Sequence, residues 1–216
     1  MTIWAYFVHY ADMQFEKISS LDVAEPKQEA ILEAAVGVFA RYGFRKTSMD
    51  EVARAAGVSR QGLYLLFADK EELFRKAISY KLSRQLSAAI IELSDPLAPL
   101  ESRLISACDE WGGRSVGLFA GDAADLMCAG TTLAGATVAH YESEFEHALT
   151  QALVESPLAN FCAKVGVQPS DVARTLLATV RGLKHSCKSR QEFVQQMTAA
   201  ARMFCAPLKL PILLEE

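Results

Sequence analysis

The chain has 216 residues, of which 51% are hydrophobic, and 26 acidic against 22 basic side chains give a formal net charge of −4. This balance argues against a protein that coats nucleic acid non-specifically, because such proteins need a strong excess of positive charge. The length allows one large domain or two smaller ones with a sizeable core. No apolar run reaches the ~20 residues of a membrane span, so no membrane partner is expected.

Five cysteines are scattered between Cys108 and Cys205 without any C-x-x-C spacing. An odd number in this arrangement favours reduced thiols over a disulfide framework, and we therefore expect a cytoplasmic protein. The apolar start of the chain lacks a basic n-region and soon reaches Asp12. A secretory signal peptide is not expected from such a start.

Residues 1–24 form an N-terminal extension rich in aromatic side chains, including Trp4, Phe7 and Tyr10. We interpret this segment as an extra helix that packs on the body of the protein or on a partner subunit. The alternative is an arm that enters the minor groove of DNA. That alternative is disfavoured because Lys17 is the only Lys or Arg in the segment.

The next two helices are predicted from their spacing and their ends. The stretch from Gln28 to Tyr42 places apolar side chains on one helical stripe, and Gly43 follows directly. Ser48 and Glu51 then form an S-x-x-E capping box, which predicts a short helix that begins at Met49.

Gly57 stands where this short helix must end, and glycine accepts a left-handed turn at little steric cost. Ser59 is the natural N-cap of a second short helix, and Val58 and Leu63 can form a hydrophobic staple across its start. We expect Leu63, Leu66 and Phe67 to be buried. The side chains left near the exposed N-terminal end are Arg60, Gln61, Gly62 and Tyr64. Two short helices at a sharp angle are typical of a helix-turn-helix unit, whose second helix lies in the major groove of DNA.

A D-x-x-E start at Asp69 to Glu72 opens a long amphipathic helix that runs through Leu73 to Ile90. The prolines of Asp95-Pro-Leu-Ala-Pro99 end it and mark the start of a second domain.

Three motifs between Pro26 and Leu86 together resemble the N-terminal domain of the tetracycline-repressor (TetR/AcrR) family of bacterial transcription regulators. They read Ala34-x4-Phe39-x3-Gly43-Phe44-x2-Thr47-Ser48, Val52-Ala53-x2-Ala56-Gly57-Val58-Ser59 and Leu63-Tyr64-x2-Phe67-x2-Lys70-Glu71-x-Leu73. Two positions depart from the usual pattern: Gln61 precedes Gly62, and Leu65 and Leu66 stand where polar, aromatic or histidine residues are common. The resemblance implies an all-α fold, with a three-helix helix-turn-helix domain followed by a larger helical domain for ligand binding and dimerisation.

A double-stranded DNA operator is therefore the expected partner. Residues 25–80 carry nine Lys and Arg against eight Asp and Glu, while the rest of the chain is acidic. We expect Arg60, Gln61, Tyr64 and Leu65 to meet bases, the leucine through a thymine methyl group. The residues expected to hold phosphates are Lys46, Thr47, Ser48 and Lys70, and Ser59 and Gly62 complete the predicted DNA-binding set.

The second domain is expected to surround a small-molecule effector. Six of the twelve glycines fall between Gly112 and Gly135, and we predict short, interrupted apolar helices there, as a cavity of adjustable shape requires. The candidate pocket residues are Trp111, Phe119, Met127, Tyr141 and Phe145. A loosely packed core or an interdomain loop system is the alternative. No phosphate-binding glycine motif occurs, and no cofactor is expected.

A metal site is a weaker alternative in the same region. His140, Glu144 and His147 share one side of a helix predicted from Val138 to Val154, as zinc ligands can. Because no cysteine spacing completes the set, we predict no metal.

The last two predicted helices begin at Ser170, as an N-cap, and at the capping box Ser189 to Glu192. The resemblance implies that these helices pack against a second copy as a four-helix bundle. The candidate interface residues are Val172, Leu176, Val180, Leu183, Met197 and Phe204. The alternative for part of this set is that the side chains complete the core of the protomer itself.

We therefore predict a homodimeric, sequence-specific transcriptional regulator and not an enzyme, most simply a repressor that a small, mainly apolar ligand releases from DNA. Its parts are an extension (1–24), a DNA-binding domain (25–88) and a ligand-binding and dimerisation domain (89–216). The alternatives are a helical adaptor that binds only protein, and a cysteine-dependent enzyme that uses Cys128 and His140. The enzyme alternative lacks a third residue that would orient the histidine as a base.

Overall fold

The structure is a computed structural model that describes residues 26–117 and 123–209. Its α-helices are α2 (Pro26–Tyr42), α3 (Met49–Ala55), α4 (Arg60–Leu66), α5 (Lys70–Leu93), α6 (Leu100–Trp111), α7 (Ala123–Val154), α8 (Leu158–Val165), α9 (Pro169–Ser186) and α10 (Arg190–Cys205). Two 3₁₀ turns, η1 (Gly113–Ser115) and η2 (Ala206–Leu208), follow α6 and α10. These two ranges contain no strand, and the predicted all-α fold is confirmed. The predicted extension of residues 1–24 lies outside the described residues.

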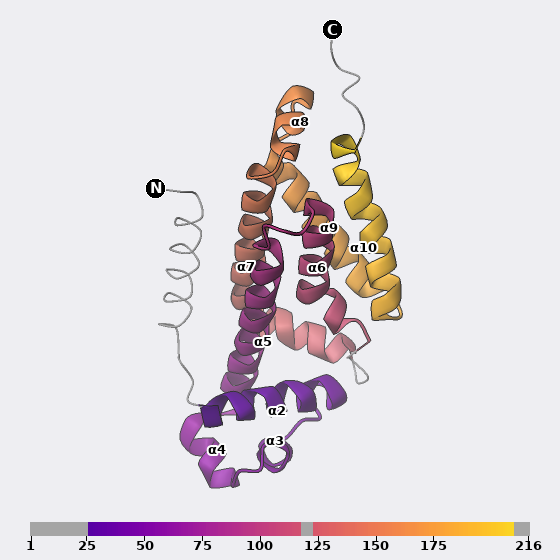
Figure 1. Ribbon diagram of the computed structural model, residues 1–216. Coiled ribbons are helices and arrows are strands. Elements are labelled where there is room, and N and C mark those ends of the chain that lie inside the picture. Colours follow the sequence, from indigo (N-terminus) through magenta and orange to yellow (C-terminus); the bar gives the residue numbers. More distant parts are fainter. Residues whose placement is uncertain (1–25, 118–122, 210–216) are drawn as a thin grey trace, which may run out of the picture.

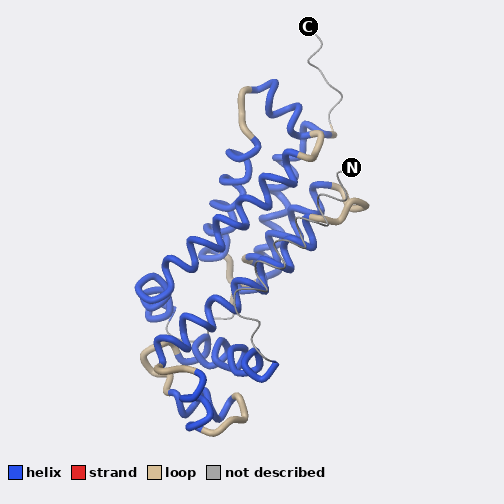
Figure 2. The backbone as a smooth tube through the Cα atoms, turned by 90° about the vertical axis from the view of Figure 1, so that its left-hand side faces the viewer, coloured by secondary structure: helices blue, strands red, loops and turns tan. Residues whose placement is uncertain are grey.

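The molecule is elongated, with α2, α3 and α4 together at one end (Figure 1). From this end, α5 and α7 run side by side along the length of the protein, and α6, α9 and α10 lie beside them (Figures 1 and 2). We call the part formed by α2–α4 and the first half of α5 the head, and the remainder the body.

The head has its own apolar core, to which each of its helices contributes. Phe39 of α2 and Phe74 of α5 meet edge to face with ring centroids 5.0 Å apart, a favoured aromatic geometry. Val52 of α3 and Leu63 of α4 are fully buried in the same cluster. The two short helices are therefore held by their apolar faces against two longer ones.

The body has a second core, formed by the later half of α5 together with α6, α7, α9 and α10. Leu86, Leu104 and Phe193 are among its fully buried side chains. Because α5 is continuous and contributes to both cores, the boundary predicted at residue 88 falls inside a helix. The domain limits stay a prediction.

Two predicted helix starts differ from the structure. Short, interrupted helices were expected around Gly112 to Gly135, but α7 begins at Ala123 and continues without a break to Val154. The last long pair begins one residue before Ser170, because Pro169 takes the first helical position. Proline suits that position because its missing N–H would have no partner there.

The described part of the chain contains no helix that is both long enough and apolar enough to cross a membrane.

Candidate nucleic-acid interface

Helix α3 starts with the capping box predicted from the sequence. The Ser48 backbone N–H donates to Glu51 Oε2 at 2.7 Å, and the Glu51 N–H donates to Ser48 Oγ at 3.3 Å. The backbone hydrogen bond from Ser48, followed by the one from its hydroxyl group, lowers the pKa of the Glu51 carboxyl from its ordinary value. Glu51 is thus an anion next to the helix N-terminus, where the helix dipole favours negative charge.

The turn between α3 and α4 depends on glycine, and α4 on a serine cap, as predicted. Gly57 has a left-handed backbone with φ of 66°, and the Gly62 N–H donates to Ser59 Oγ at 3.0 Å. A Cβ atom added at Gly62 would lie 3.1 Å from Ser59 Oγ. The small residue at this position therefore leaves room for the cap.

Helix α4 is fastened by one face and exposes the other. Leu63 and Phe67 are 0% and 1% exposed, and they anchor the helix to the head core. Tyr64 and Leu65 point to solvent, with exposed fractions of 42% and 80%. The prediction that Leu66 is buried is wrong, since it is 42% exposed. Leu66 lies beside the buried stripe that Leu63 and Phe67 form, and not within it.

Arg60 is exposed at the start of α4 and has two neighbours that orient it. Its Nη1 atom lies 3.1 Å from Asp50 Oδ2 of α3, and its guanidinium carbon lies 5.6 Å from the centroid of the Tyr64 ring. One of its donors is engaged by the carboxylate, and others are available to a base edge. Gln61, between these residues in sequence, is exposed as well.

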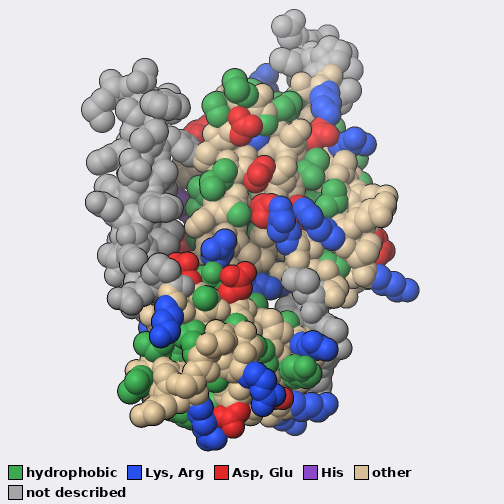
Figure 3. Space-filling model, turned by 60° about the horizontal axis from the view of Figure 1, so that its bottom comes forward, with side chains coloured by type: hydrophobic (Ala, Val, Ile, Leu, Met, Phe, Trp, Pro, Cys, Tyr) green, Lys and Arg blue, Asp and Glu red, His purple; other side chains and the backbone are tan. Residues whose placement is uncertain are grey.

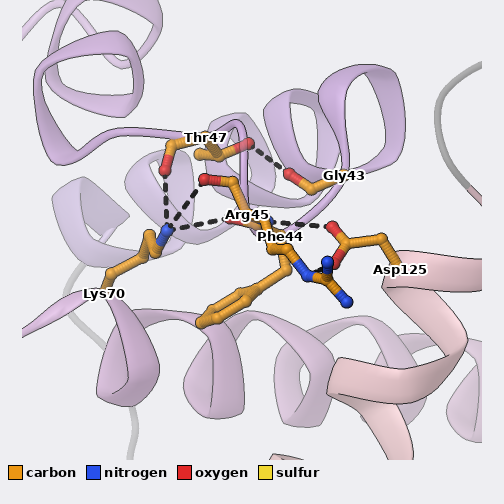
Figure 4. A network of polar contacts seen from close by, with 6 residues as sticks. All are labelled: Gly43, Phe44, Arg45, Thr47, Lys70 and Asp125. Carbon is orange, nitrogen blue, oxygen red and sulfur yellow. Dashed lines mark hydrogen bonds and ion pairs between the residues drawn. The ribbon is translucent and has the colours of Figure 1, made fainter.

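The four predicted phosphate-binding residues fall into two pairs. Lys46 and Ser48 are exposed. Thr47 is 2% exposed, and its hydroxyl donates to the Gly43 carbonyl at 2.6 Å. The Lys70 ammonium donates to the carbonyls of Phe44 at 2.9 Å and Thr47 at 3.0 Å (Figure 4). Thr47 and Lys70 thus hold the loop between α2 and α3 in this conformation.

The far end of the head carries a cluster of basic side chains with few acidic ones among them (Figure 3). Arg45, Lys46, Arg54 and Arg60 are exposed basic residues of the head. A surface that meets the DNA backbone needs such cations around the helix that reads the bases.

The predicted pocket residues of the body are only partly brought together. Trp111 of α6 stacks on the buried Phe145 of α7, with ring centroids 4.9 Å apart. Tyr141 packs against the same core, and its hydroxyl lies 3.3 Å from Ser79 Oγ of α5. Met127 is 58% exposed and does not belong to the body core. The reason is that the first turns of α7 lie against the head and not inside the body. Phe119 lies outside the described residues.

Two lysines border the body core, a feature that the periodicity of the sequence did not indicate. Burial lowers the pKa of Lys81 to about 8, and the charge of Lys184 acts in the same direction. Burial also lowers the pKa of Lys184, against the opposing effect of Glu142. Both lysines are partly buried.

The metal alternative has no support in the described ranges, where no group of three potential ligands comes together. His140 and His147 are exposed on α7. Three of the cysteines have a raised pKa because of burial, Cys108 to about 12 and Cys205 to about 11, and Cys162 in the same direction. Thiols of this kind are poor nucleophiles near neutral pH.

Four of the six predicted dimer residues are buried in the protomer itself, as the alternative for part of this set expected, and the interface stays a prediction. Val172, Leu176, Val180 and Met197 are at most 8% exposed, and Leu183 and Phe204 pack against the same cluster. A helical stripe of apolar residues indicates burial but not the partner that buries it. The opposite faces of α9 and α10 are exposed and carry the small residues Ala178, Gly182 and Ala199.

These features define a two-part helical protein whose N-terminal head is a helix-turn-helix domain with an exposed second helix. Residues 31–77 match the family described as bacterial regulatory proteins, tetR family. The match covers most of the head and identifies that part of the chain as a tetR-type DNA-binding domain.

Curated relatives match over the same region. An uncharacterized HTH-type transcriptional regulator, YfiR of Bacillus subtilis, is 45% identical over 62 residues, which are 29% of this chain and 30% of that protein. The HTH-type transcriptional repressor BepR of Brucella suis is 34% identical over 90 residues, 40% of this chain and 43% of the repressor. The chain thus aligns with less than half the length of these relatives. Both relatives are described as HTH-type regulators of transcription.

Solved structures match over nearly the whole chain at low identity, so they support the fold alone. The fatty acid degradation regulator FadR of Bacillus halodurans superimposes with a TM-score of 0.63 at 16% identity, covering 88% of this chain and all of FadR. GusR of Salmonella enterica superimposes with a TM-score of 0.61 at 23% identity, and the match covers 87% of this chain and 99% of the GusR chain.

Proposed function

We propose that the protein is a homodimeric repressor that binds a specific DNA operator through α4 and leaves it when a small, mainly apolar ligand binds the body. The observation that carries this proposal is the exposed face of α4, where Arg60, Tyr64 and Leu65 project from a helix anchored by Leu63 and Phe67. A short, firmly seated helix with an exposed N-terminal end is the geometry that reads the major groove.

Each exposed group on α4 suits a particular base edge. The free donors of Arg60 match the paired acceptors O6 and N7 of guanine, and the apolar tip of Leu65 matches the methyl group of thymine. Tyr64 lies beside Arg60, so in the proposal it meets a base and also supports the orientation of the guanidinium group. Around them, Lys46 and Ser48 are exposed for phosphate contacts. In the proposal, Thr47 and Lys70 contribute indirectly, by holding the loop.

The ligand part of the proposal is supported by the aromatic stack of Trp111 and Phe145 next to Tyr141. These side chains come from α6 and α7, and Ser79 links Tyr141 to α5. Because α5 continues into the head core, a ligand that displaces it would change the position of α4. In a dimer, half-sites lie about one helical turn (~34–36 Å) apart, so a small change in the spacing of the heads lowers affinity for DNA.

The test begins with selection of bound duplexes from a random pool, followed by affinity measurements on the selected site at fixed salt. We expect Arg60→Ala and Tyr64→Ala each to weaken binding by about 5- to 150-fold, the range of one base contact of ~1–3 kcal/mol. Arg114→Ala is the matched control, because Arg114 is an exposed arginine of the body paired with Glu110.

Loss of selected-site binding in the α4 variants, with unchanged thermal unfolding and an unaffected control, supports the proposal. Wild-type protein that binds no duplex in preference to the pool contradicts it. A screen of small molecules for release of the selected duplex then tests the ligand part separately.

A further inference from the structure

The start of α7 belongs to the core of the head, although it is separated from the head in sequence by α6. Ala129 is 7% exposed and is part of the head cluster, and Leu126 and Leu133 pack against that cluster. The second domain therefore supplies part of the surface on which the helix-turn-helix unit rests.

A single carboxylate adds a polar contact at the same place. Asp125, in the first turn of α7, is 8% exposed. Its Oδ2 atom accepts a hydrogen bond from the Arg45 backbone N–H at 2.8 Å, and its Oδ1 atom lies 3.0 Å from Arg45 Nε (Figure 4). Asp125 thus holds both the backbone and the side chain of one residue in the loop between α2 and α3.

The same loop is held by groups of the head itself. Lys70 donates to the carbonyls of Phe44, Arg45 and Thr47, and the Thr47 hydroxyl donates to Gly43 (Figure 4). The loop leads directly into the capping box that starts α3. Its orientation therefore sets the direction of α3, which packs on α4. Of the contacts drawn in Figure 4, only those to Asp125 come from the body.

We propose that Asp125 is a positioning residue for operator recognition: it fixes the loop before α3 and so ties the orientation of α4 to the position of α7. This role rests on the proposed function. It gives α7 a route to the recognition helix that is separate from the continuous helix α5. A buried carboxylate that accepts a backbone N–H holds geometry firmly, since leaving that N–H unpaired is costly.

The experiment compares Asp125→Ala and Asp125→Asn with Glu142→Gln. Glu142 is a control on the same helix, because it also pairs with an arginine, Arg181, but within the body. Affinity is measured for the selected duplex and for a random duplex of equal length at the same salt concentration. The quantity that tests the proposal is the ratio of the two affinities.

We expect the ratio to fall about tenfold in Asp125→Ala, within the range of typical coupling between sites, and less in Asp125→Asn, whose amide oxygen can still accept from the Arg45 N–H. Affinity for the random duplex should stay equal or rise, because a negative charge that pairs with Arg45 has been removed. A merely destabilised protein would instead lose both affinities together. Glu142→Gln should keep the wild-type ratio.

Hydrogen exchange provides a readout that does not depend on DNA. The Arg45 amide should exchange faster in Asp125→Ala, while amides in the middle of α9 keep their wild-type protection. An unchanged ratio in Asp125→Ala, or an Arg45 amide that is equally protected in both proteins, overturns the role of Asp125 and leaves the proposed function intact. Wild-type protein without any preferred duplex overturns the proposed function, and this role with it.

Discussion

Lys70 occupies the first position of α5, where the dipole of the helix disfavours a positive charge. The structure compensates for this with carbonyl partners: the ammonium group donates to three of them, and it lies 4.5 Å from the centroid of the Phe44 ring. A lysine at a helix N-terminus was the one signal in the sequence that could have indicated such a role. Lys46, in the loop itself, is exposed.

Replacing Lys70 with methionine keeps the aliphatic stem and removes the charged donor. We expect the free energy of unfolding to fall by about 2 kcal/mol, because several partly buried carbonyls lose a charge-assisted hydrogen bond. Chemical denaturation at neutral pH measures the change.

Lys46→Met is the matched variant, because Lys46 is exposed and is proposed to contact a DNA phosphate. Its free energy of unfolding should stay within about 0.5 kcal/mol of the wild type. The salt dependence of operator binding should become shallower by about one unit for each phosphate that the variant no longer neutralises. Equal stability of Lys70→Met and the wild type would contradict the role of Lys70 in holding the loop between α2 and α3.

The predictions for α4 and those for Thr47 and Lys70 differ in the sequence distance between each residue and the groups that it contacts. Most of the exposed face of α4 could be predicted, because the burial of Leu63 and Phe67 follows from their helical spacing of four residues, whereas Leu66 was assigned to the wrong side. The contacts of Lys70 go to carbonyls 23 to 26 residues earlier in the chain. No local pattern contains that information, so Lys70 and Thr47 were assigned to phosphates by charge and polarity alone.

At the scale of elements, the turn between α3 and α4 depends on the backbone freedom of Gly57. The Cβ atom of an alanine at this position would meet nothing within 4 Å, but φ is positive. A substitution there therefore reports conformational strain without a steric clash. Gly37 has equally open surroundings, but it lies inside α2 and has no positive φ. An alanine there causes neither strain nor a clash.

We expect Gly57→Ala to lower the free energy of unfolding by about 1–2 kcal/mol, the cost of a left-handed backbone for an L-residue. Gly37→Ala should raise it by about 0.5–1 kcal/mol, because alanine is the better helix former. Thermal and chemical unfolding of both variants give the comparison. Two changes of the same sign would contradict the role assigned to the turn.

Helix α7 is the element whose length was predicted least well from the sequence. Gly130 and Gly135 suggested interruptions, yet both lie inside a continuous helix. Each glycine costs a helix about 1 kcal/mol relative to alanine, whereas burying a leucine contributes about 1.5–3 kcal/mol. Leu126 and Leu133 are partly buried against the head core, and Ala129 is buried in it, so tertiary contacts oppose the local preference of the glycines. That packing depends on α2 and α5, which no window around the glycines includes.

At the scale of the whole molecule, the apolar stripes predicted on α9 and α10 are present, but four of the six residues named for the dimer are buried within the protomer. The apolar sides of both helices face the protomer core, which leaves their outer faces exposed. Ala178 and Gly182 on α9, and Ala199 on α10, are exposed. Small side chains allow helices of two protomers to approach closely, and Met203 adds an apolar side chain that is 76% exposed.

An arginine at position 178 tests whether these outer faces join two copies. We expect Ala178→Arg to shift the protein from dimer to monomer in sedimentation experiments, because a bulky charge would be buried without a partner. Operator affinity should fall in parallel, since a single head reads only one half-site. Ala163→Arg, at an exposed position of α8, is the control and should remain dimeric. If Ala178→Arg keeps the dimer mass, the interface lies elsewhere, whereas a monomeric wild type contradicts the dimer itself.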